Sequence, residues 1–316
     1  MQKRLTPYPL IALLCILVLA ACASIGSPDG GAYDETPPKV VKCQPANMSV
    51  NNREKKLTLT FDEFIVLENA SEKVVVSPPQ KEMPEIRTSG KKIHITLNDS
   101  LKKNTTYTVD FSDAIVDNNE GNPMGNFTYA FSTGSEIDTM EVSGTLLEAE
   151  NLEPIKGMLV GLYADLADST FTTQSFTRVS RTNSRGQFTI KGVAPGKYRI
   201  YGLQDMDGDF RFSQKAEKIA FDSVIIEPTC APDTRQDTVW IDSTHIDTVK
   251  TIPYTHFYPD NVILRGFTED YQDLHLLKTE RPIPEMFTLY FTGPSDTIPT
   301  LKGLNFEGVG NMVLER

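Results

Sequence analysis

Three aspartates alternate in "DMDGDFRF", which runs from residue 205 to residue 212. Asp205, Asp207 and Asp209 are spaced so that their carboxylates could meet around one cation, and calcium prefers oxygen ligands of this kind. The stretch departs from the usual twelve-residue calcium loop, because Gly208 stands at position four and Glu217 at position thirteen. Two interpretations stay open, a calcium site and a solvated acidic turn at the rim of a β-sandwich.

A second chemical pattern is Asp followed by Ser or Thr and then by an apolar residue or Thr. It occurs eight times in the chain, whereas composition alone predicts roughly one or two. The pattern resembles the O-glycan acceptor that one group of bacteria uses on exported proteins. The resemblance implies eight acceptor hydroxyls, at Ser100, Thr139, Ser169, Ser223, Thr238, Ser243, Thr248 and Thr297. The alternative is that Asp-Ser and Asp-Thr simply suit strand ends.

The first cysteine that can carry chemistry is Cys22, in "LVLAACASIGSPDGG". Lys3 and Arg4 precede an apolar run of about twelve residues, which is too short to span a bilayer and is typical of a helical signal peptide. Residues 19–22, "LAAC", resemble a bacterial lipobox. The resemblance implies cleavage of residues 1–21 and acylation of Cys22, with palmitate-type chains anchoring the protein in the membrane. Residues 22–36 are rich in Gly and small polar residues and are expected to form a flexible tether.

The residue after the lipidated cysteine carries a sorting signal in such lipoproteins. Here it is Ala23 rather than Asp, which by resemblance favours the outer membrane over the inner membrane. The first acidic residue is Asp29, so the acidic surface-export signal of some lineages is not expected. We therefore expect attachment to the outer membrane, with the periplasmic face favoured over the cell surface.

No arrangement in the sequence indicates an enzyme. The four histidines, His94, His245, His256 and His275, are scattered, and no His-Glu-x-x-His zinc motif or Gly-x-Ser-x-Gly nucleophile motif occurs. Cys43 and Cys230 have no nearby histidine in the sequence, and we expect them to remain two separate thiols rather than a disulfide. We expect no catalytic residues, no firm metal site and no cofactor other than the calcium considered above.

The charge balance limits the classes of partner. The precursor carries a net charge of −11, and removing residues 1–21 takes away two basic residues and no acidic ones. A strongly acidic chain is a poor ligand for nucleic acid. It suits a soluble body held beside a membrane.

Residues 37–134 show alternating apolar patterns that predict an antiparallel β-sandwich. Examples are "KLTLTFDEFI" at 56–65 and "KKIHITL" at 91–97. The segments "PPKVV", "LTLTFDEFI" and "YTVDFSDAIVDNNEGNPMGNFTYAFST" resemble the bacterial Ig-like domain of surface lipoproteins. The late positions that carry the resemblance are Tyr107, Asp117, Gly121, Asn122, Pro123 and Phe131.

Residues 140–228 alternate in the same way. The segments "VSGTLLEAENLEPIKGMLVGLY" and "TNSRGQFTIKGVAPGKYRIYGLQD" resemble the transthyretin-like regulatory domain that follows carboxypeptidase catalytic domains. The matching positions are Gly144, Pro154, Ser184, Gly186, Phe188, Gly192, Pro195, Gly196 and Tyr198. No carboxypeptidase catalytic domain accompanies them in this sequence, so the resemblance implies a second sandwich and no protease chemistry.

Residues 229–316 predict an extended β-ribbon and then the opening strands of a third β domain, truncated before it closes. The alternative for these strands is a short β appendage on the second body. The whole chain is thus expected to be all-β after its signal peptide. Its expected function is that of a non-catalytic envelope scaffold, spacer or docking surface for an unknown envelope protein. The alternative is a glycan-binding lipoprotein of a nutrient-capture system, with Trp240, Tyr254, Phe257 and Tyr258 as candidate sugar-binding aromatics.

Overall fold

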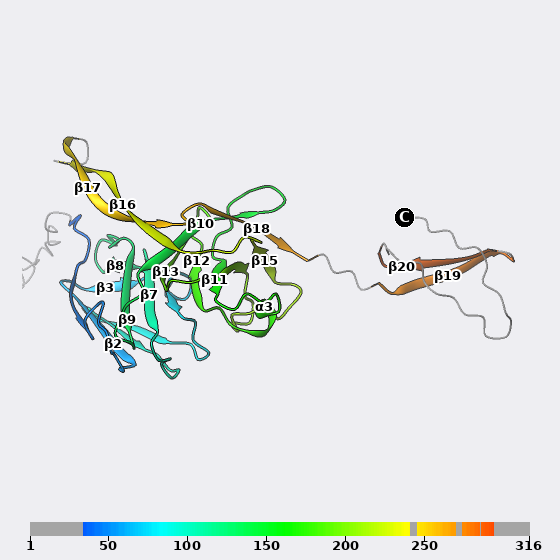
Figure 1. Ribbon diagram of the computed structural model, residues 1–316, viewed down its shortest axis with the longest axis horizontal. Coiled ribbons are helices and arrows are strands. Elements are labelled where there is room, and N and C mark those ends of the chain that lie inside the picture. The colour runs from blue at the N-terminus through cyan, green and yellow to red at the C-terminus, as the bar shows by residue number, and fades with distance from the viewer. Residues whose placement is uncertain (1–33, 241–244, 270–273, 285, 294–316) are drawn as a thin grey trace, which may run out of the picture.

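The computed structural model describes residues 34–240, 245–269, 274–284 and 286–293. Nearly all of its regular structure is β, which confirms the predicted fold class (Figure 1). The described helices are two single turns, α2 (Ala70–Lys73) and α3 (Thr170–Thr173). Among the described residues, no helix is long and apolar enough to cross a membrane. The signal peptide and the tether up to residue 33 lie outside the described residues.

The first body contains nine strands in two main sheets and one small pair. The strands are β1 (Val40–Gln44), β2 (Lys56–Phe61), β3 (Ile65–Leu67), β4 (Val75–Ser77), β5 (Glu85–Ser89), β6 (Lys92–Thr96), β7 (Thr106–Ser112), β8 (Ile115–Asp117) and β9 (Phe127–Ser132). One sheet has the order β1-β2-β6-β5 and the other the order β4-β7-β9, while β3 pairs with β8. This is the antiparallel sandwich that the alternating patterns predicted.

The core of the first body follows from the period of two in its strands. Leu59 of β2 lies opposite Ile93 of β6, and both side chains are fully buried. The facing sheet contributes large aromatic side chains, and the rings of Tyr107 and Phe131 stack at a centroid distance of 5.2 Å. Successive residues of a strand point to opposite faces, so one face of each sheet forms this core.

The second body is built on a seven-stranded sheet of order β12-β11-β14-β15-β18-β10-β13. Its strands are β10 (Met140–Glu148), β11 (Leu159–Tyr163), β12 (Arg178–Arg181), β13 (Gln187–Val193), β14 (Arg199–Leu203), β15 (Lys218–Phe221) and β18 (Val262–Thr268). The main buried cluster includes Val142, Leu146, Val160, Leu162, Ile190, Ile200 and Leu264. A second cluster, which includes Tyr163, Phe171 and Phe176, packs Leu203 and Ile219.

Strand β18 belongs to the sheet of the second body, although the sequence predicted that residues 229–316 form a separate C-terminal extension. It runs parallel to β10 and antiparallel to β15. A side chain at Gly144 would bring a Cβ atom within 2.0 Å of the Val262 carbonyl oxygen, so this close pairing needs glycine. Parallel partners are separated by long connections, and the local pattern around Val262 gives no sign of a partner more than 100 residues earlier.

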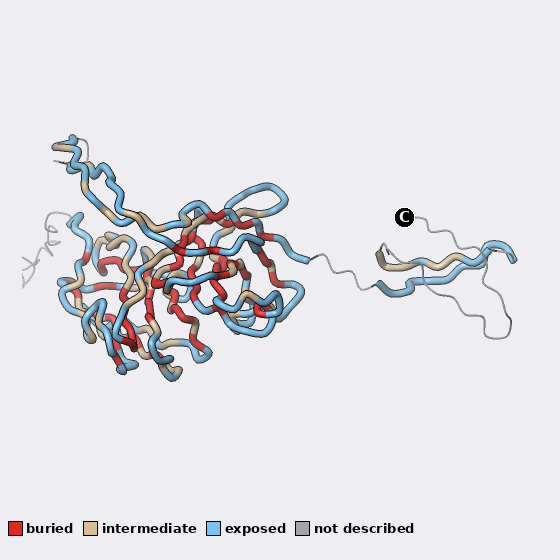
Figure 2. Tube along the Cα trace, viewed as in Figure 1, coloured by how far each residue is buried: buried red, intermediate tan, exposed pale blue. Residues whose placement is uncertain are grey.

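Two further pairs of strands complete the described structure, one inserted in the chain between β15 and β18 and one after β18. Strands β16 (Thr229–Trp240) and β17 (Ile246–Tyr258) form a long antiparallel ribbon, and β19 (Leu276–Ile283) pairs with β20 (Met286–Phe291). Figure 2 shows buried residues concentrated in the two sandwiches, while the ribbon is exposed along most of its length. The ribbon leads directly into β18, which returns the chain to the sheet of the second body.

Candidate functional site

The two sandwiches are joined around Arg178, the first residue of β12. Its side chain belongs to the second body, but Nη1 donates to the carbonyl oxygens of Ser77 at 3.2 Å and Thr106 at 2.5 Å in the first body. Nη2 donates to Thr108 Oγ1 at 3.1 Å. Only 5% of the residue is exposed. Burial lowers the pKa of Arg178 to about 10, which still leaves it charged at neutral pH.

Arg178 also bridges two strands of its own body. Nε and Nη2 donate to the carbonyl oxygen of Lys191 on β13, which stands at the opposite end of the sheet order from β12. The guanidinium therefore satisfies backbone carbonyls on β4, β7 and β13 together. A buried charge is tolerated when its donors are satisfied in this way. Sequence reasoning missed Arg178, and its only signal was a charged residue within the strand-like stretch "FTRVSR".

Polar contacts surround this buried arginine. Val179 N donates to Ser77 Oγ at 3.0 Å, and Lys191 Nζ donates to Thr128 Oγ1 at 2.7 Å. Asp138, in the segment between the bodies, accepts from Thr106 Oγ1 at 2.8 Å. Contacts from three separate segments thus fix the second body against the first.

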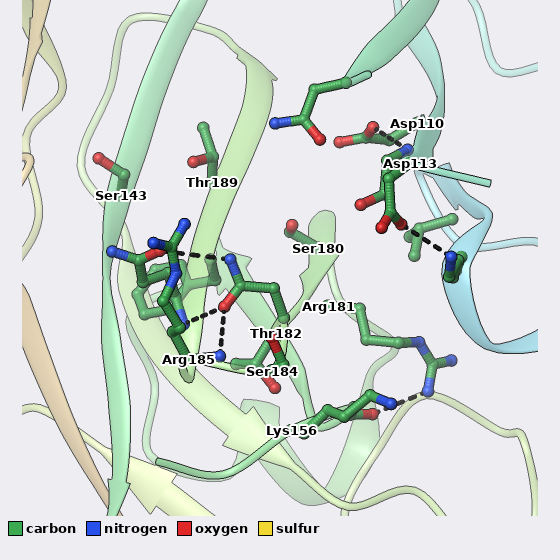
Figure 3. A pocket seen from close by; sticks show the side chains of 18 of the residues that line it. Asp110, Asp113, Ser143, Lys156, Ser180, Arg181, Thr182, Ser184, Arg185 and Thr189 are labelled. Atoms are coloured by element: carbon green, nitrogen blue, oxygen red, sulfur yellow. Dashed lines mark hydrogen bonds and ion pairs between the residues drawn. The ribbon is translucent and has the colours of Figure 1, made fainter. Parts of the chain in front are cut away.

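A polar cleft of about 1180 Å³ lies beside this joint. Figure 3 shows residues of the first body, such as Asp110 and Asp113, across the opening from Lys156, Arg181 and Arg185 of the second body. The apolar side chains in its lining are those of Val75 and Phe188, and both residues are buried. The accessible lining is therefore dominated by charged, hydroxyl and amide groups. This cleft is a candidate binding site.

The two walls of the cleft differ in how their charges are paired. On the first body, Asp113 pairs with Lys73 at 3.1 Å and Asp110 with Lys191 at 3.4 Å. On the second body, Arg181 Nη1 donates to the Gly157 carbonyl oxygen at 2.8 Å, while its buried Nε has no acceptor among the described residues. Burial lowers the pKa of Arg181.

Strand register places hydroxyl and amide groups on the floor of the cleft. Ser143 of β10 lies opposite Thr189 of β13, and Thr145 lies opposite Gln187. Residues paired across an antiparallel ladder share one face, so these four side chains form one polar patch. Figure 3 shows Ser143 and Thr189 on neighbouring strands of this floor.

The structure brings the three predicted calcium ligands together. One carboxylate oxygen from each of Asp205, Asp207 and Asp209 lies within 4.8 Å of the others. Their oxygens also have partners inside the loop. Asp209 Oδ2 pairs with Arg211 Nε at 2.6 Å, and Asp207 Oδ2 accepts from Ser213 and Gln214. These contacts satisfy the carboxylates as a polar turn would, so calcium stays a prediction.

Glu217, beyond the predicted cluster, holds the same loop closed. It is fully buried, and its carboxylate accepts hydrogen bonds from the backbone N–H groups of Met206, Ser213 and Gln214. In the sequence, Glu217 is notable only for standing at position thirteen, one residue beyond the place of the usual last calcium ligand. In the structure its partners are the backbone groups that the loop leaves unpaired.

The loop after β8 is organised by Asp117, one of the residues that carried the Ig-like resemblance. Its carboxylate accepts backbone N–H bonds from Asn119, Glu120, Gly121 and Asn122 at 2.7 to 3.1 Å. Burial acts to raise the pKa of Asp117, but these four bonds outweigh it and lower the pKa to about 2. Asp117 therefore serves the fold of this loop.

Six of the eight predicted O-glycan acceptors lie within the described residues. Ser100, Thr139, Ser169 and Ser223 are exposed and outside strands, while Thr238 and Thr248 are half-buried in the ribbon. Several of the preceding aspartates have structural roles. Asp99 accepts from the backbone of Lys81 and Glu82, and Asp168 pairs with Arg199. Ser243 and Thr297 lie outside the described residues, and glycosylation stays a prediction.

The remaining predicted positions have separate outcomes. Cys43 and Cys230 are free thiols, as predicted, and burial raises the pKa of Cys43, which disfavours a reactive thiolate. Cys22 lies outside the described residues. Tyr254 and Tyr258 flank His256 on the ribbon, and the His256 and Tyr258 rings stack at 4.4 Å. The aromatic rings proposed for sugar binding thus pack partly against their own strand neighbours.

Residues 34–133 match the bacterial Ig-like domain family. This match confirms the Ig-like resemblance of the first body. The matched region is the first sandwich, and the transthyretin-like resemblance of the second body stays a prediction. No curated protein matches the chain.

Solved structures with some similarity include a transpeptidase, an S-layer protein and a pilin. One is an L,D-transpeptidase from Mycobacterium smegmatis, with 12% identity, a TM-score of 0.22, and coverage of 50% of this chain and 77% of that one. The N-terminal part of the bacterial S-layer protein SbsC gives 15% identity, a TM-score of 0.23, and coverage of 56% and 42%. The T6 backbone pilin of Streptococcus pyogenes has 10% identity and a TM-score of 0.20, and the match covers 65% of this chain and 61% of the pilin chain. The chain thus spans less than two thirds of the latter two, and similarity this low indicates no function.

Proposed function

We propose that this protein is a non-catalytic, lipid-anchored scaffold of the bacterial cell envelope, in which two β-sandwiches act together as a rigid spacer. The observation that supports this role is the Arg178 joint. A buried guanidinium that donates to both bodies resists bending, because any hinge motion would break charge-assisted hydrogen bonds at a buried position. The Ig-like family match of residues 34–133 agrees with such a role.

The anchor in this proposal is Cys22. Acyl chains on Cys22 would hold the chain at the membrane, and residues 22–36 would separate the first sandwich from the lipid surface. Membrane attachment raises the effective concentration of whatever the sandwiches hold. We propose the outer membrane because Ala23, rather than Asp, follows Cys22. We propose its periplasmic side because the first acidic residue, Asp29, does not directly follow the cysteine as a surface-export signal would require.

Fractionation of cells tests the anchor, and protease treatment of intact cells tests the membrane face. We expect the wild type in the membrane fraction and Cys22→Ser in the soluble fraction, with Cys43→Ser as the matched control that stays with the membrane. Protection from protease until the outer membrane is opened supports the periplasmic side. A Cys22→Ser protein that still fractionates with membranes would overturn the lipid anchor, and digestion on intact cells would move the sandwiches to the cell surface.

A further inference from the structure

We infer that the cleft between the two sandwiches binds an anionic saccharide, through cations on its second-body wall and hydroxyl and amide groups on its floor. The cleft, of about 1180 Å³, is large enough for a small oligosaccharide, since ligand pockets usually run from about 300 to 1,000 Å³. This activity goes beyond the scaffold role and does not depend on lipid anchoring.

The charge of the ligand follows from which groups in the cleft lack partners. Lys156 and Arg185 are exposed and have no carboxylate partner among the described residues. Arg181 donates a hydrogen bond to a backbone carbonyl and interacts only at longer range with the carboxylates of Asp205 and Glu72. The acidic lining residues Asp110 and Asp113 are neutralised by lysines. Glu72 has no described ion pair, and Asp260 pairs with His256, which is charged only when protonated. The three cations Lys156, Arg181 and Arg185 outnumber the two acidic residues Glu72 and Asp260, so positive charge exceeds negative charge in the lining. This excess stands out in a chain of net charge −11, and it favours an anion.

The saccharide class follows from the polar floor. Ser143, Thr145, Gln187 and Thr189 share one face of β10 and β13, and they offer donors and acceptors to a ligand that carries many hydroxyls. Val75 and Phe188, the apolar lining residues, are buried, so a lipid or an apolar peptide side chain would find no pocket. A neutral sugar would find no exposed aromatic ring in this lining to stack on, so charge must supply much of the affinity.

The test is calorimetric titration of the purified full chain at low salt with tetragalacturonate, a sulfated oligosaccharide of similar length, and maltotetraose as the neutral control. We expect the anionic saccharides to bind and maltotetraose to fail, with binding weakened as salt rises. The two anionic probes distinguish carboxylate from sulfate as the recognised group. Tetraglutamate, an anionic peptide, tests whether charge alone is recognised. The proposal would be overturned if maltotetraose bound equally well, if neither anionic saccharide bound, or if tetraglutamate bound as tightly as they do.

Variants locate the binding in the cleft. Lys156→Gln with Arg185→Gln should weaken binding about tenfold, as expected for the loss of two charged contacts. The matched control Lys103→Gln with Lys197→Gln removes the same charge from exposed positions outside the lining and should leave the affinity unchanged. Ser143→Ala with Thr189→Val should weaken saccharide binding several-fold with an unchanged thermal midpoint. Equal losses of affinity in the cleft variant and the control variant would mean that the saccharide is attracted non-specifically, and would contradict binding in the cleft.

Discussion

Arg178 Nη2 lies 3.1 Å from Thr108 Oγ1, so a cation of the second sandwich is buried against a strand of the first. The same side chain reaches carbonyl oxygens of Ser77, Thr106 and Lys191. One residue therefore couples the two folded bodies, and its loss should affect their cooperation more than the fold of either one.

Arg178→Met should uncouple the two sandwiches. The variant leaves several buried carbonyl oxygens without donors, and we expect a loss of about 3 kcal/mol in the free energy of unfolding. Urea denaturation should change from one transition into two as the bodies unfold separately. Arg87→Met, at an exposed arginine of β5, is the control and should unfold like the wild type. An Arg178→Met protein with an unaltered single transition would contradict the joint.

Gly192→Ala should also weaken the Arg178 joint, because the added methyl group would lie too close to the guanidinium. Gly192 has φ +67°, and a Cβ atom there would lie 2.3 Å from Arg178 Nη2. We expect a loss of about 3 kcal/mol, since backbone strain and displacement of the guanidinium add together. Gly125→Ala is the matched control, because Gly125 has φ +86° with nothing within 4 Å of the added atom. Gly125→Ala should lower the free energy of unfolding by only about 1 kcal/mol. Equal losses of stability in the two variants, measured by thermal or urea denaturation, would argue against a specific clash at Gly192.

Asp117 should contribute stability that depends on pH. Its pKa is about 2 in the folded protein and 3.8 as the ordinary value. The depressed pKa means that the folded state favours the carboxylate, so this stabilisation is fully present above about pH 5 and is lost as the pH falls towards 2. Asp117→Asn should be less stable than the wild type at pH 7, and the difference should shrink by pH 2.5.

The measurement is urea denaturation at several pH values. Asp62→Asn removes a carboxylate that accepts one backbone N–H bond, from Lys39, on the same sandwich, and controls for the loss of one charge. A difference between Asp117→Asn and the wild type that stays constant from pH 7 to pH 2.5 would contradict the role of the four backbone bonds.

Calcium should at most bind weakly at Asp205, Asp207 and Asp209. The carboxylates converge, but a cation must compete with Arg211 for Asp209 and with Gln214 for Asp207. We therefore expect an affinity in the millimolar range, at the weak end for calcium modules. Thermal melts with calcium, and with magnesium as the ionic control, should show a rise for calcium that Asp207→Asn removes. No rise at 10 mM calcium, about ten times the upper end of that range, would leave the loop as a polar turn.

The sequence alone determined the local β structure of this protein. Alternation in "KLTLTF" and "KIHIT" predicted strands whose inner faces form the first core, because residues two apart on a strand share a face. Asp117 was among the residues that carried the Ig-like resemblance, and its role in the loop fits the ability of an aspartate to bond the backbone of residues that directly follow it. The free state of Cys43 and Cys230 was predicted correctly as well.

Tertiary structure decided what lies between these elements. The pairing of β18 with β10, the burial of Arg178 and the charges that meet in the cleft each join segments far apart in the chain. Neither the period of a strand nor the chemistry of a turn specifies such partners. In the sequence, Arg178 looks like any exposed charged residue of a strand. It becomes a buried joint only because the fold surrounds its guanidinium with three carbonyl oxygens and one hydroxyl oxygen.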